Sequence, residues 1–356
     1  MAMRSRSIPQ LNKNFHVRIF LIPLRDKPII SQVMYTLILF FFLPVYIVLL
    51  KPEFIIMLPN FCILSSIASL ILSKFTKVKF ILDVRSTPVE ISGFRGCLQS
   101  FAFTISVLLA KKFFAGMTII TSPMKKEICK KYKINPDKIG VWTSGVSTTL
   151  FDPRNYISEG AKLKTKFGLS KKFVIFYHGS FSATRGLVET IDAINVLRDT
   201  YPDVVLFLLG SGPIISELKD LVQKESLQGN VIIHNPVDYA EVPKFVEMSD
   251  LCITPLPNHP YWRFQCPLKL LEYLAMEKVV IATDIPAHRS VIGKEKCGLY
   301  ISSIKPTEIA KSIVYAYHNK DKLKEWGKSG RTIVTEKYTW EKVANDLENY
   351  LLSIDN

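Results

Sequence analysis

The strongest constraint on the fold of this 356-residue chain is an alternation of short apolar runs with longer helical segments, which occurs twice along the sequence. Short apolar runs bounded by turn residues predict buried strands, and the longer segments between them predict helices. A strand, a crossing helix and a further strand form the βαβ unit of a parallel sheet. The sequence therefore predicts an α/β protein with two parallel sheets.

The expected elements fall into two sets. The first half is expected to hold strands Val17–Ile22, Phe54–Leu58, Phe80–Val84, Thr118–Thr121 and Ile139–Trp142, with helices Cys62–Leu72, Leu98–Phe114 and Met124–Tyr132. The second half is expected to hold strands Phe173–His178, Val204–Leu209, Val231–His234, Leu251–Thr254, Val279–Ala282 and Gly298–Ile301, with helices Leu187–Thr200, Ile215–Glu225, Tyr239–Met248, Leu268–Met276, Pro306–His318 and Trp340–Leu352. Turn residues around Ser144 and Pro153 predict domains at 1–152 and 153–335, followed by a terminal helix within 336–356.

Charge is concentrated in the first half. Residues 1–152 carry 20 Lys and Arg against 7 Asp and Glu, whereas residues 153–356 carry 26 against 24. A basic surface can face nucleic acid, anionic lipid or an acidic substrate, or it can simply maintain solubility. The basic residues adjoin apolar runs rather than alternate with stacking aromatic side chains, so no nucleic-acid partner is expected.

The uncharged segment from Ile29 to Leu50 is long enough to span a bilayer. It could be a transmembrane helix, a buried helix, or a helix that packs on a sheet and dips its outer face into a membrane surface. We favour the third interpretation, because a spanning helix would separate Val17–Ile22 from the rest of the fold. Nearby lysines, such as Lys111 and Lys112, supply cations for anionic lipid.

The remaining composition points to the cytoplasm. No long apolar run follows the basic start of the chain directly, so a secretory signal is not expected. None of the six cysteines lies in a CxxC pair, which favours reduced thiols. The six histidines are scattered, so we expect neither a metal site nor a cofactor. The predicted location is the inner face of the cytoplasmic membrane, with an anionic membrane surface as a partner.

Two glycine turns follow expected strands in the second half. Strand Phe173–His178 runs into Gly179-Ser180, and Arg185-Gly186 then opens a helix. Glycine lets backbone N–H groups approach a phosphate, a helix start adds partial positive charge, and arginine can bind two phosphate oxygens. The alternative is an ordinary turn with an exposed arginine. The next strand ends in Gly210-Ser211-Gly212-Pro213, a second strand end open to a ligand.

The segment from Cys266 to Met276 is more specific. Pro267 fits a helix start, where free N–H groups can bind an anion beside Lys269. Glu272 lies three residues later on the same side of the helix, where a carboxylate suits the two hydroxyls of a nucleotide ribose. The alternative is a surface Lys–Glu pair.

The order and spacing of these three segments, followed by Val279-Val280-Ile281-Ala282-Thr283, resemble the donor half of a family 4 glycosyltransferase. The resemblance implies the GT-B fold, in which two Rossmann-like domains face each other across a cleft and a terminal helix crosses back to the first domain. It also implies metal-independent transfer of a sugar, with retention, from a UDP- or GDP-sugar to a hydroxyl of a glycan or lipid-linked acceptor. Cell-surface polysaccharide or glycoconjugate synthesis is the expected setting.

The resemblance also implies residue roles. Glu272 would bind the donor ribose, and Arg185 and Lys269 the diphosphate. The remaining donor-binding positions would be Gly179, Ser180, Gly186, Gly210 and Gly212, the Cys266–Pro267–Leu268 segment, and Pro236 and Val237 beside the nucleobase. Arg85 would stand at the acceptor side, where relatives often place a catalytic-site histidine; its alternative is a solvent-facing arginine.

Three features depart from the family pattern. Phe264 stands eight positions before Glu272, where many members have a first glutamate, and Ser180 replaces a frequent arginine. Only 16 residues precede Val17, so we expect either that the chain is shortened or that its usual first strand is lost. Two other functions therefore stay open. One is an epimerase or hydrolase of nucleotide sugars, with Glu90 and His178 as candidate acid–base groups, and the other is a catalytically impaired membrane-associated homologue.

Overall fold

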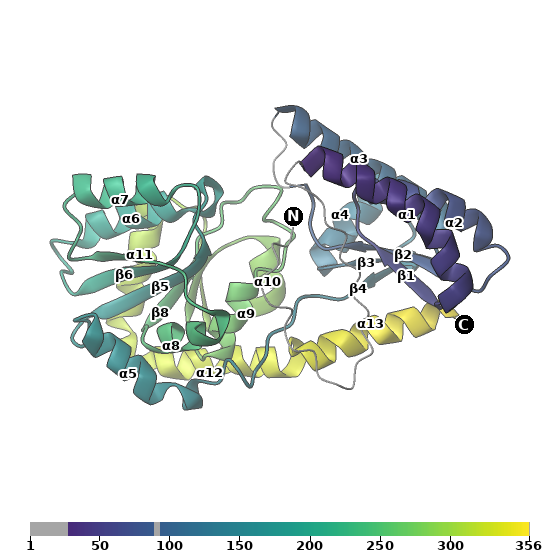
Figure 1. Cartoon of the computed structure of the whole chain (residues 1–356). Coiled ribbons are helices and arrows are strands. Elements are labelled where there is room, and N and C mark those ends of the chain that lie inside the picture. Colours follow the sequence, from purple (N-terminus) through teal and green to yellow (C-terminus); the bar gives the residue numbers. More distant parts are fainter. Residues whose placement is uncertain (1–27, 89–92, 356) are drawn as a thin grey trace. The chain divides into compact units, whose positions relative to one another are not determined.

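The computed structural model describes residues 28–88 and 93–355, which form two compact units (Figure 1). The first unit comprises the described chain up to Thr118 together with Ile128–Gly140. The second comprises Ile119–Glu127 and the chain from Val141 onward. The predicted strand Val17–Ile22 lies outside the described residues.

The first unit is built on a four-stranded sheet with the order β1-β2-β3-β4, in which β1 and β2 pair in parallel. Strand β2 contributes to its core and is buried from Phe80 to Val84. The strands are β1 (Phe54–Met57), β2 (Lys79–Val84), β3 (Gly116–Ile119) and β4 (Ile139–Val141). The helices are α1 (Pro28–Leu50), the 3₁₀ turn η1 (Phe61–Ser65), α2 (Ser66–Leu72), α3 (Gly93–Phe113), α4 (Ser122–Tyr132) and the 3₁₀ turn η2 (Pro136–Lys138).

The second unit is built on a six-stranded parallel sheet with the order β10-β9-β8-β5-β6-β7. The chain enters at β5, moves outward through β6 and β7, and returns to place β8 beside β5. Ligands of open α/β sheets bind at the carboxyl ends of the strands at such a switch point. The strands are β5 (Phe173–Ser180), β6 (Val204–Ser211), β7 (Val231–His234), β8 (Leu251–Thr254), β9 (Val280–Thr283) and β10 (Gly298–Ile301).

Nine α-helices accompany the described second sheet, and three of them were not predicted. The predicted helices are α6 (Leu187–Leu197), α7 (Ile215–Lys224), α8 (Val242–Glu247) with its preceding 3₁₀ turn η5 (Tyr239–Glu241), α9 (Leu268–Ala275), α11 (Pro306–His318) and α13 (Trp340–Asp355). The additional helices are α5 (Ile157–Lys166), α10 (Pro286–Ile292) and α12 (Lys320–Lys337), and short 3₁₀ turns lie at η3 (Pro153–Asn155) and η4 (Ala183–Arg185). Helix α12 was not predicted because two of its buried positions are glycines, Gly327 and Gly330. The apolar residues of the sequence therefore do not show a clear helical periodicity there.

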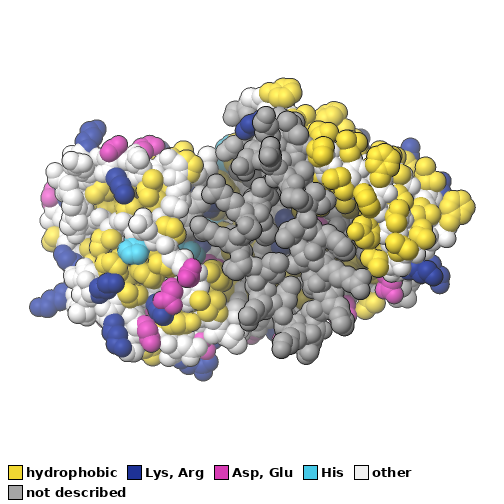
Figure 2. All heavy atoms as spheres, in the orientation of Figure 1, with side chains coloured by type: hydrophobic (Ala, Val, Ile, Leu, Met, Phe, Trp, Pro, Cys, Tyr) yellow, Lys and Arg dark blue, Asp and Glu magenta, His cyan; other side chains and the backbone are white. Residues whose placement is uncertain are grey.

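Helix α1 is exposed along most of its length, so the alternative of an ordinary buried helix is wrong for the described residues. By length and composition, two helical segments could cross a membrane, Gln32–Leu50 and Gly93–Phe113, and only 6% of the first is buried. One side of α1 packs on the unit, because Ile47 is buried and the Thr36 hydroxyl donates to Cys62 Sγ at 3.7 Å. The other side leaves large apolar side chains in solvent, and Figure 2 shows hydrophobic side chains gathered over α1 and α2.

All six cysteines are free, in agreement with the prediction of reduced thiols. Cys252, Cys266 and Cys297 are buried, whereas Cys97 is exposed on α3.

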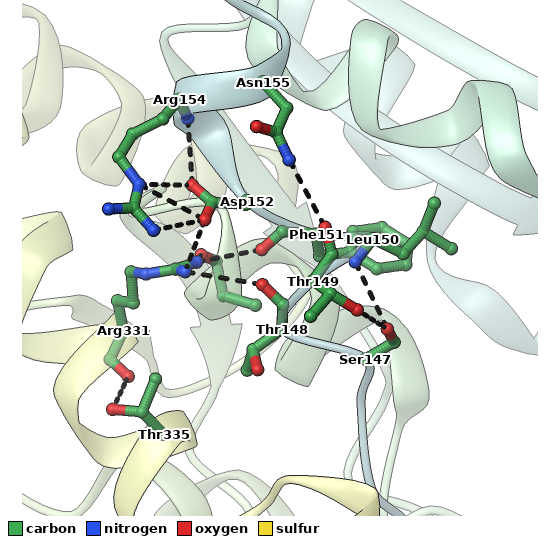
Figure 3. A network of polar contacts seen from close by, with 11 residues as sticks. Ser147, Thr148, Thr149, Leu150, Phe151, Asp152, Arg154, Asn155, Arg331 and Thr335 are labelled. Atoms are coloured by element: carbon green, nitrogen blue, oxygen red, sulfur yellow. Dashed lines mark hydrogen bonds and ion pairs between the residues drawn. The ribbon is translucent and has the colours of Figure 1, made fainter.

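Arg331 on α12 ties the segment around the predicted domain boundary to α9 (Figure 3). Its guanidinium donates to the carbonyl oxygens of Phe151 at 2.9 Å and Ala275 at 2.5 Å, and forms an ion pair with Asp152 at 3.2 Å. Asp152 also accepts from Arg154. Because Ala275 is the last residue of α9, this network fixes the end of the helix that carries Lys269 and Glu272.

We expect the Asp152→Asn variant to be less stable at neutral pH, by about 1–2 kcal/mol of unfolding free energy. The hydrogen bond from Arg154 is the main cause that lowers the pKa of Asp152 to about 2, and Arg331 adds to it. A lowered folded-state pKa stabilises the protein above the unfolded pKa near 3.8, and this contribution is lost as pH falls toward 2. Urea unfolding of both proteins across this range checks the expectation. The stability difference should narrow on acidification, and two parallel pH profiles would contradict it.

Candidate active site

The candidate site lies in the second unit, where β5 ends beside the start of α9. Gly179 has φ +122°, and a Cβ placed there would come 3.1 Å from Lys269 Nζ. The backbone at the end of β5 is therefore next to the lysine ammonium, and the predicted phosphate-binding role of this turn stays a prediction. Gly186 has φ +68° and starts α6, and its Cβ would lie 2.2 Å from the carbonyl oxygen of Pro255, which follows β8.

Gly210 and Gly212 have a packing role at this strand edge. A Cβ at Gly210 would lie 2.0 Å from the carbonyl oxygen of Gly179, and one at Gly212 would lie 2.1 Å from that of Phe181. Only glycine allows the ends of β5 and β6 to approach this closely. Their predicted contact with the donor stays a prediction.

Lys269 is a buried cation without a hydrogen-bond partner among the described residues. It is 9% exposed, and its Nζ lies 3.6 Å from the centre of the Tyr177 ring. Burial lowers the pKa of Lys269 well below its usual value, and the positive charge of Arg185 lowers it further. An ammonium group held this way favours the arrival of an anion.

Arg185 is a second cation at the same place. Its guanidinium lies 4.8 Å from the centre of the Trp262 ring, and the Trp262 indole N–H donates to the carbonyl oxygen of Thr184 at 2.9 Å. Arg185 Nε is buried and has no hydrogen-bond partner in the part of the chain that is described. Tyr177 adjoins both cations, and burial raises its pKa to about 12, so it contributes no negative charge. The end of β5 is thus a cationic site that is suited to bind an anion.

Glu272 is the carboxylate of this site, and both of its oxygens have partners. Oε1 accepts from the Tyr239 hydroxyl at 2.7 Å, and Oε2 lies 2.8 Å from His178 Nε2. Burial opposes ionisation, but the hydrogen bonds of His178 and Tyr239 outweigh it and lower the pKa of Glu272. With 3% exposure, Glu272 is not part of a surface Lys–Glu pair.

His178 orients Glu272. Burial lowers the pKa of His178, which favours the neutral ring, and its Nε2 lies 2.8 Å from Glu272 Oε2. Tyr273 binds the other side of the residue, because its hydroxyl lies 3.0 Å from Nδ1 and accepts from the His178 backbone N–H at 2.9 Å. Both ring nitrogens are engaged, which argues against His178 as a mobile acid–base group. The other candidate of that kind, Glu90, lies outside the described residues.

The structure places the remaining predicted residues as follows. Ser180 is exposed at the end of β5, and Pro267 caps the start of α9 with no side-chain hydrogen bond. Cys266 is buried and Leu268 is half exposed. Pro236 is exposed and Val237 half-buried, both in the loop after β7. Arg85 follows β2 in the first unit, half-buried in the wall of a cavity, and is not simply facing solvent.

Three features of the site were not predicted from the sequence. They are the Tyr177 ring beside Lys269, the Tyr239 hydroxyl on Glu272, and the contact between His178 and Glu272. The pairing joins residues 94 positions apart, so no local pattern could reveal it. The position of Tyr239 could have been recognised from the sequence. It lies at the end of the loop after β7, and ligands of parallel sheets bind at the carboxyl ends of the strands. Among the described residues, no three His, Cys, Asp or Glu side chains cluster in a way that could hold a metal ion.

Comparisons with known proteins show a family match within the second unit. Residues 161–333 match the glycosyl transferases group 1 family. The chain is 20% identical over 286 residues to the glycosyltransferase MJ1607 of Methanocaldococcus jannaschii, spanning 78% of this chain and 70% of that protein. It is 17% identical over 233 residues to the alpha-D-kanosaminyltransferase of Streptomyces kanamyceticus, spanning 65% of this chain and 59% of that protein.

Solved structures share the fold. A glycosyltransferase from Rickettsia africae matches with a TM-score of 0.75 and 19% identity, covering 94% of this chain and 84% of that one. Anabaena HepE, solved with UDP and glucose, matches with a TM-score of 0.70 and 14% identity, covering 92% and 81%. The chain therefore has the GT-B fold, and residues 161–333 are the part of it that matches the glycosyl transferases group 1 family.

Proposed function

We propose that the protein transfers a sugar from a nucleotide diphosphate, with UDP as the preferred carrier, to a hydroxyl group of a glycan or lipid-linked acceptor. The observation that carries this proposal is the pair of cations beside the Glu272 carboxylate: Lys269 Nζ and Arg185 Nε are buried and have no hydrogen-bond partner among the described residues. A diphosphate would complete the hydrogen bonds of both cations, while Glu272 would receive the ribose hydroxyls. HepE, with the same fold, has been solved with UDP, which supports the choice of nucleotide.

In this reaction the bond between the anomeric carbon and the diphosphate oxygen breaks, and a bond to the acceptor oxygen forms on the same face. The acceptor proton leaves to the departing diphosphate. Lys269, Arg185 and the uncapped N–H groups of α9 would stabilise the negative charge that develops on the leaving group. No step requires a metal ion or a protein nucleophile, so retention without a metal is part of the proposal.

A panel of UDP- and GDP-sugars tests the function. We expect one UDP-sugar to raise the melting temperature and to release UDP when an acceptor is present, with equal rates in EDTA and in magnesium. Isomerised donor would support an epimerase, and sugar released into water would support a hydrolase. Failure of every nucleotide sugar to bind would support a catalytically impaired protein. Loss of sugar transfer in EDTA would refute only the proposal that the reaction needs no metal ion.

We also propose that the enzyme works at the inner face of the cytoplasmic membrane, in the synthesis of cell-surface polysaccharide or glycoconjugate. Support comes from the exposed apolar face of α1 and from the basic first half of the chain. The contacts of Thr36 and Ile47 with the unit favour a helix that lies on the membrane surface over one that spans it.

A further inference from the structure

The carboxylate of Glu272, to which the proposed function assigns the donor ribose, is already covered at both of its oxygens. Its side chain is 5% exposed, Oε1 accepts from the Tyr239 hydroxyl at 2.7 Å, and Oε2 lies 2.8 Å from His178 Nε2. Ribose hydroxyls that bind this carboxylate must therefore take the place of a group that contacts it in the free protein.

Of the two groups, His178 is the one that is held in place. It lies near the end of β5, and its ring stacks on the buried Phe176 ring with 5.9 Å between the ring centres. The Tyr273 hydroxyl lies 3.0 Å from its Nδ1 and accepts from its backbone N–H at 2.9 Å. His178 would have to give up these contacts to leave Glu272.

Tyr239 is free to move by comparison. It is the first residue of the 3₁₀ turn η5 and is 56% exposed. Among the described residues, its hydroxyl bonds only to Glu272, and its ring lies 5.6 Å from the ring centre of Phe151. Rotation of this side chain would open Glu272 Oε1 at the loss of one hydrogen bond and one ring contact.

The Tyr239 hydroxyl is chemically similar to a ribose hydroxyl as a partner for Glu272. Both are neutral O–H donors, and an ionised carboxylate forms the same kind of charge-assisted hydrogen bond with each of them. Burial and the charge of Glu272 raise the pKa of Tyr239, so the hydroxyl keeps its proton and stays a donor. The free protein thus satisfies this buried carboxylate oxygen with its own side chain.

We propose that the Tyr239 hydroxyl occupies the place of a donor ribose hydroxyl on Glu272, and that the nucleotide binds by displacing it. The inference rests on the proposed function and deepens it by naming a residue that sets the affinity for the donor. Because the nucleotide binds only molecules in which this hydrogen bond is open, its apparent affinity is reduced to the fraction of such molecules.

Nucleotide binding by the Tyr239→Phe variant tests the proposal, because phenylalanine keeps the ring and removes only the hydroxyl. Dissociation constants are measured by calorimetry for UDP, dideoxy-UDP without the two ribose hydroxyls, and inorganic pyrophosphate. We expect the variant to bind UDP roughly tenfold more tightly than wild type, since the competing charge-assisted hydrogen bond is absent. Dideoxy-UDP and pyrophosphate should bind both proteins with equal affinity, because neither offers ribose hydroxyls to Glu272.

Tyr317→Phe is the matched control. The Tyr317 hydroxyl also donates to a carboxylate, Asp203 Oδ2, at 2.8 Å. Asp203 directly precedes β6, so this pair lies at the edge of the sheet opposite the donor site. Removal of this hydroxyl should leave the affinity for UDP unchanged. An equal gain in both variants would show a general loosening of the unit and would overturn the proposal.

Weaker or unchanged UDP binding by Tyr239→Phe would also overturn it, as would an equal gain for dideoxy-UDP. Should this variant fail to fold, Tyr239→Leu removes the same hydroxyl and should likewise gain affinity for UDP alone. UDP binding by wild type without a gain in the variant rejects only the role of Tyr239. Absence of UDP binding by wild type and both variants rejects the proposed function together with this inference.

Discussion

Replacing Glu272 with alanine is expected to abolish sugar transfer while the protein still folds. The variant would lack the two charge-assisted hydrogen bonds from the ribose hydroxyls to the carboxylate, each worth about 1.5–3 kcal/mol. The corresponding loss in kcat/KM is roughly 100-fold to 10,000-fold. Removal of the carboxylate also leaves His178 Nε2 and the Tyr239 hydroxyl without their acceptor. We therefore expect a moderate fall in melting temperature along with the loss of activity.

Two further variants separate the ribose role from a stability effect. Glu272→Gln keeps the side-chain shape and an acceptor oxygen, so its melting temperature should approach that of wild type while transfer stays strongly impaired. Glu277→Gln changes a glutamate that follows α9 and should leave donor affinity unchanged. Unchanged donor affinity and rate in Glu272→Ala would refute the ribose assignment.

Replacing Lys269 with methionine is expected to stabilise the free protein and to abolish transfer. The ammonium is buried and has no hydrogen-bond partner among the described residues, so it costs folding free energy in the absence of a ligand. A methionine of similar length should raise the unfolding free energy by about 1–3 kcal/mol. The rate of transfer should fall roughly 100-fold to 1,000-fold, because the variant lacks the preorganised positive charge that would stabilise the leaving diphosphate.

Lys278→Met is the matched control for this result. Lys278 forms an ion pair with Glu247 at 3.2 Å and donates to a backbone carbonyl, so its removal should lower the melting temperature. Its UDP-induced rise in melting temperature should persist. A Lys269→Met protein that is destabilised like this control, and that still binds UDP normally, would show that Lys269 is a structural residue.

The fold could be predicted well because its signals are local. Each described strand of the second sheet lies within a few residues of its expected position, since short apolar runs between turns need no distant partner to be recognised. Helix α12 was missed because glycine occupies buried positions where an apolar residue would have marked the pattern. Gly327 is required there, as its Cβ would lie 1.8 Å from the carbonyl oxygen of Glu277.

The site could be predicted only in part. Lys269 and Glu272 share one helix, and Gly179 and Arg185 share one strand-to-helix connection, so their spacing is readable. The partners that set their chemistry come from other elements: His178 lies on β5, Tyr239 follows β7 and Trp262 follows β8. The burial of Lys269 could not be predicted from the sequence either. Burial is what separates its ammonium group from water and leaves it without a hydrogen-bond partner among the described residues.

A crystal structure of the protein with UDP tests the central claim most directly. The account predicts the diphosphate within hydrogen-bond distance of Lys269 Nζ and Arg185 Nε, with the ribose hydroxyls on Glu272 and the Tyr239 hydroxyl displaced from Oε1. UDP bound elsewhere, with Lys269 still unpartnered and Tyr239 still on Glu272, would contradict it.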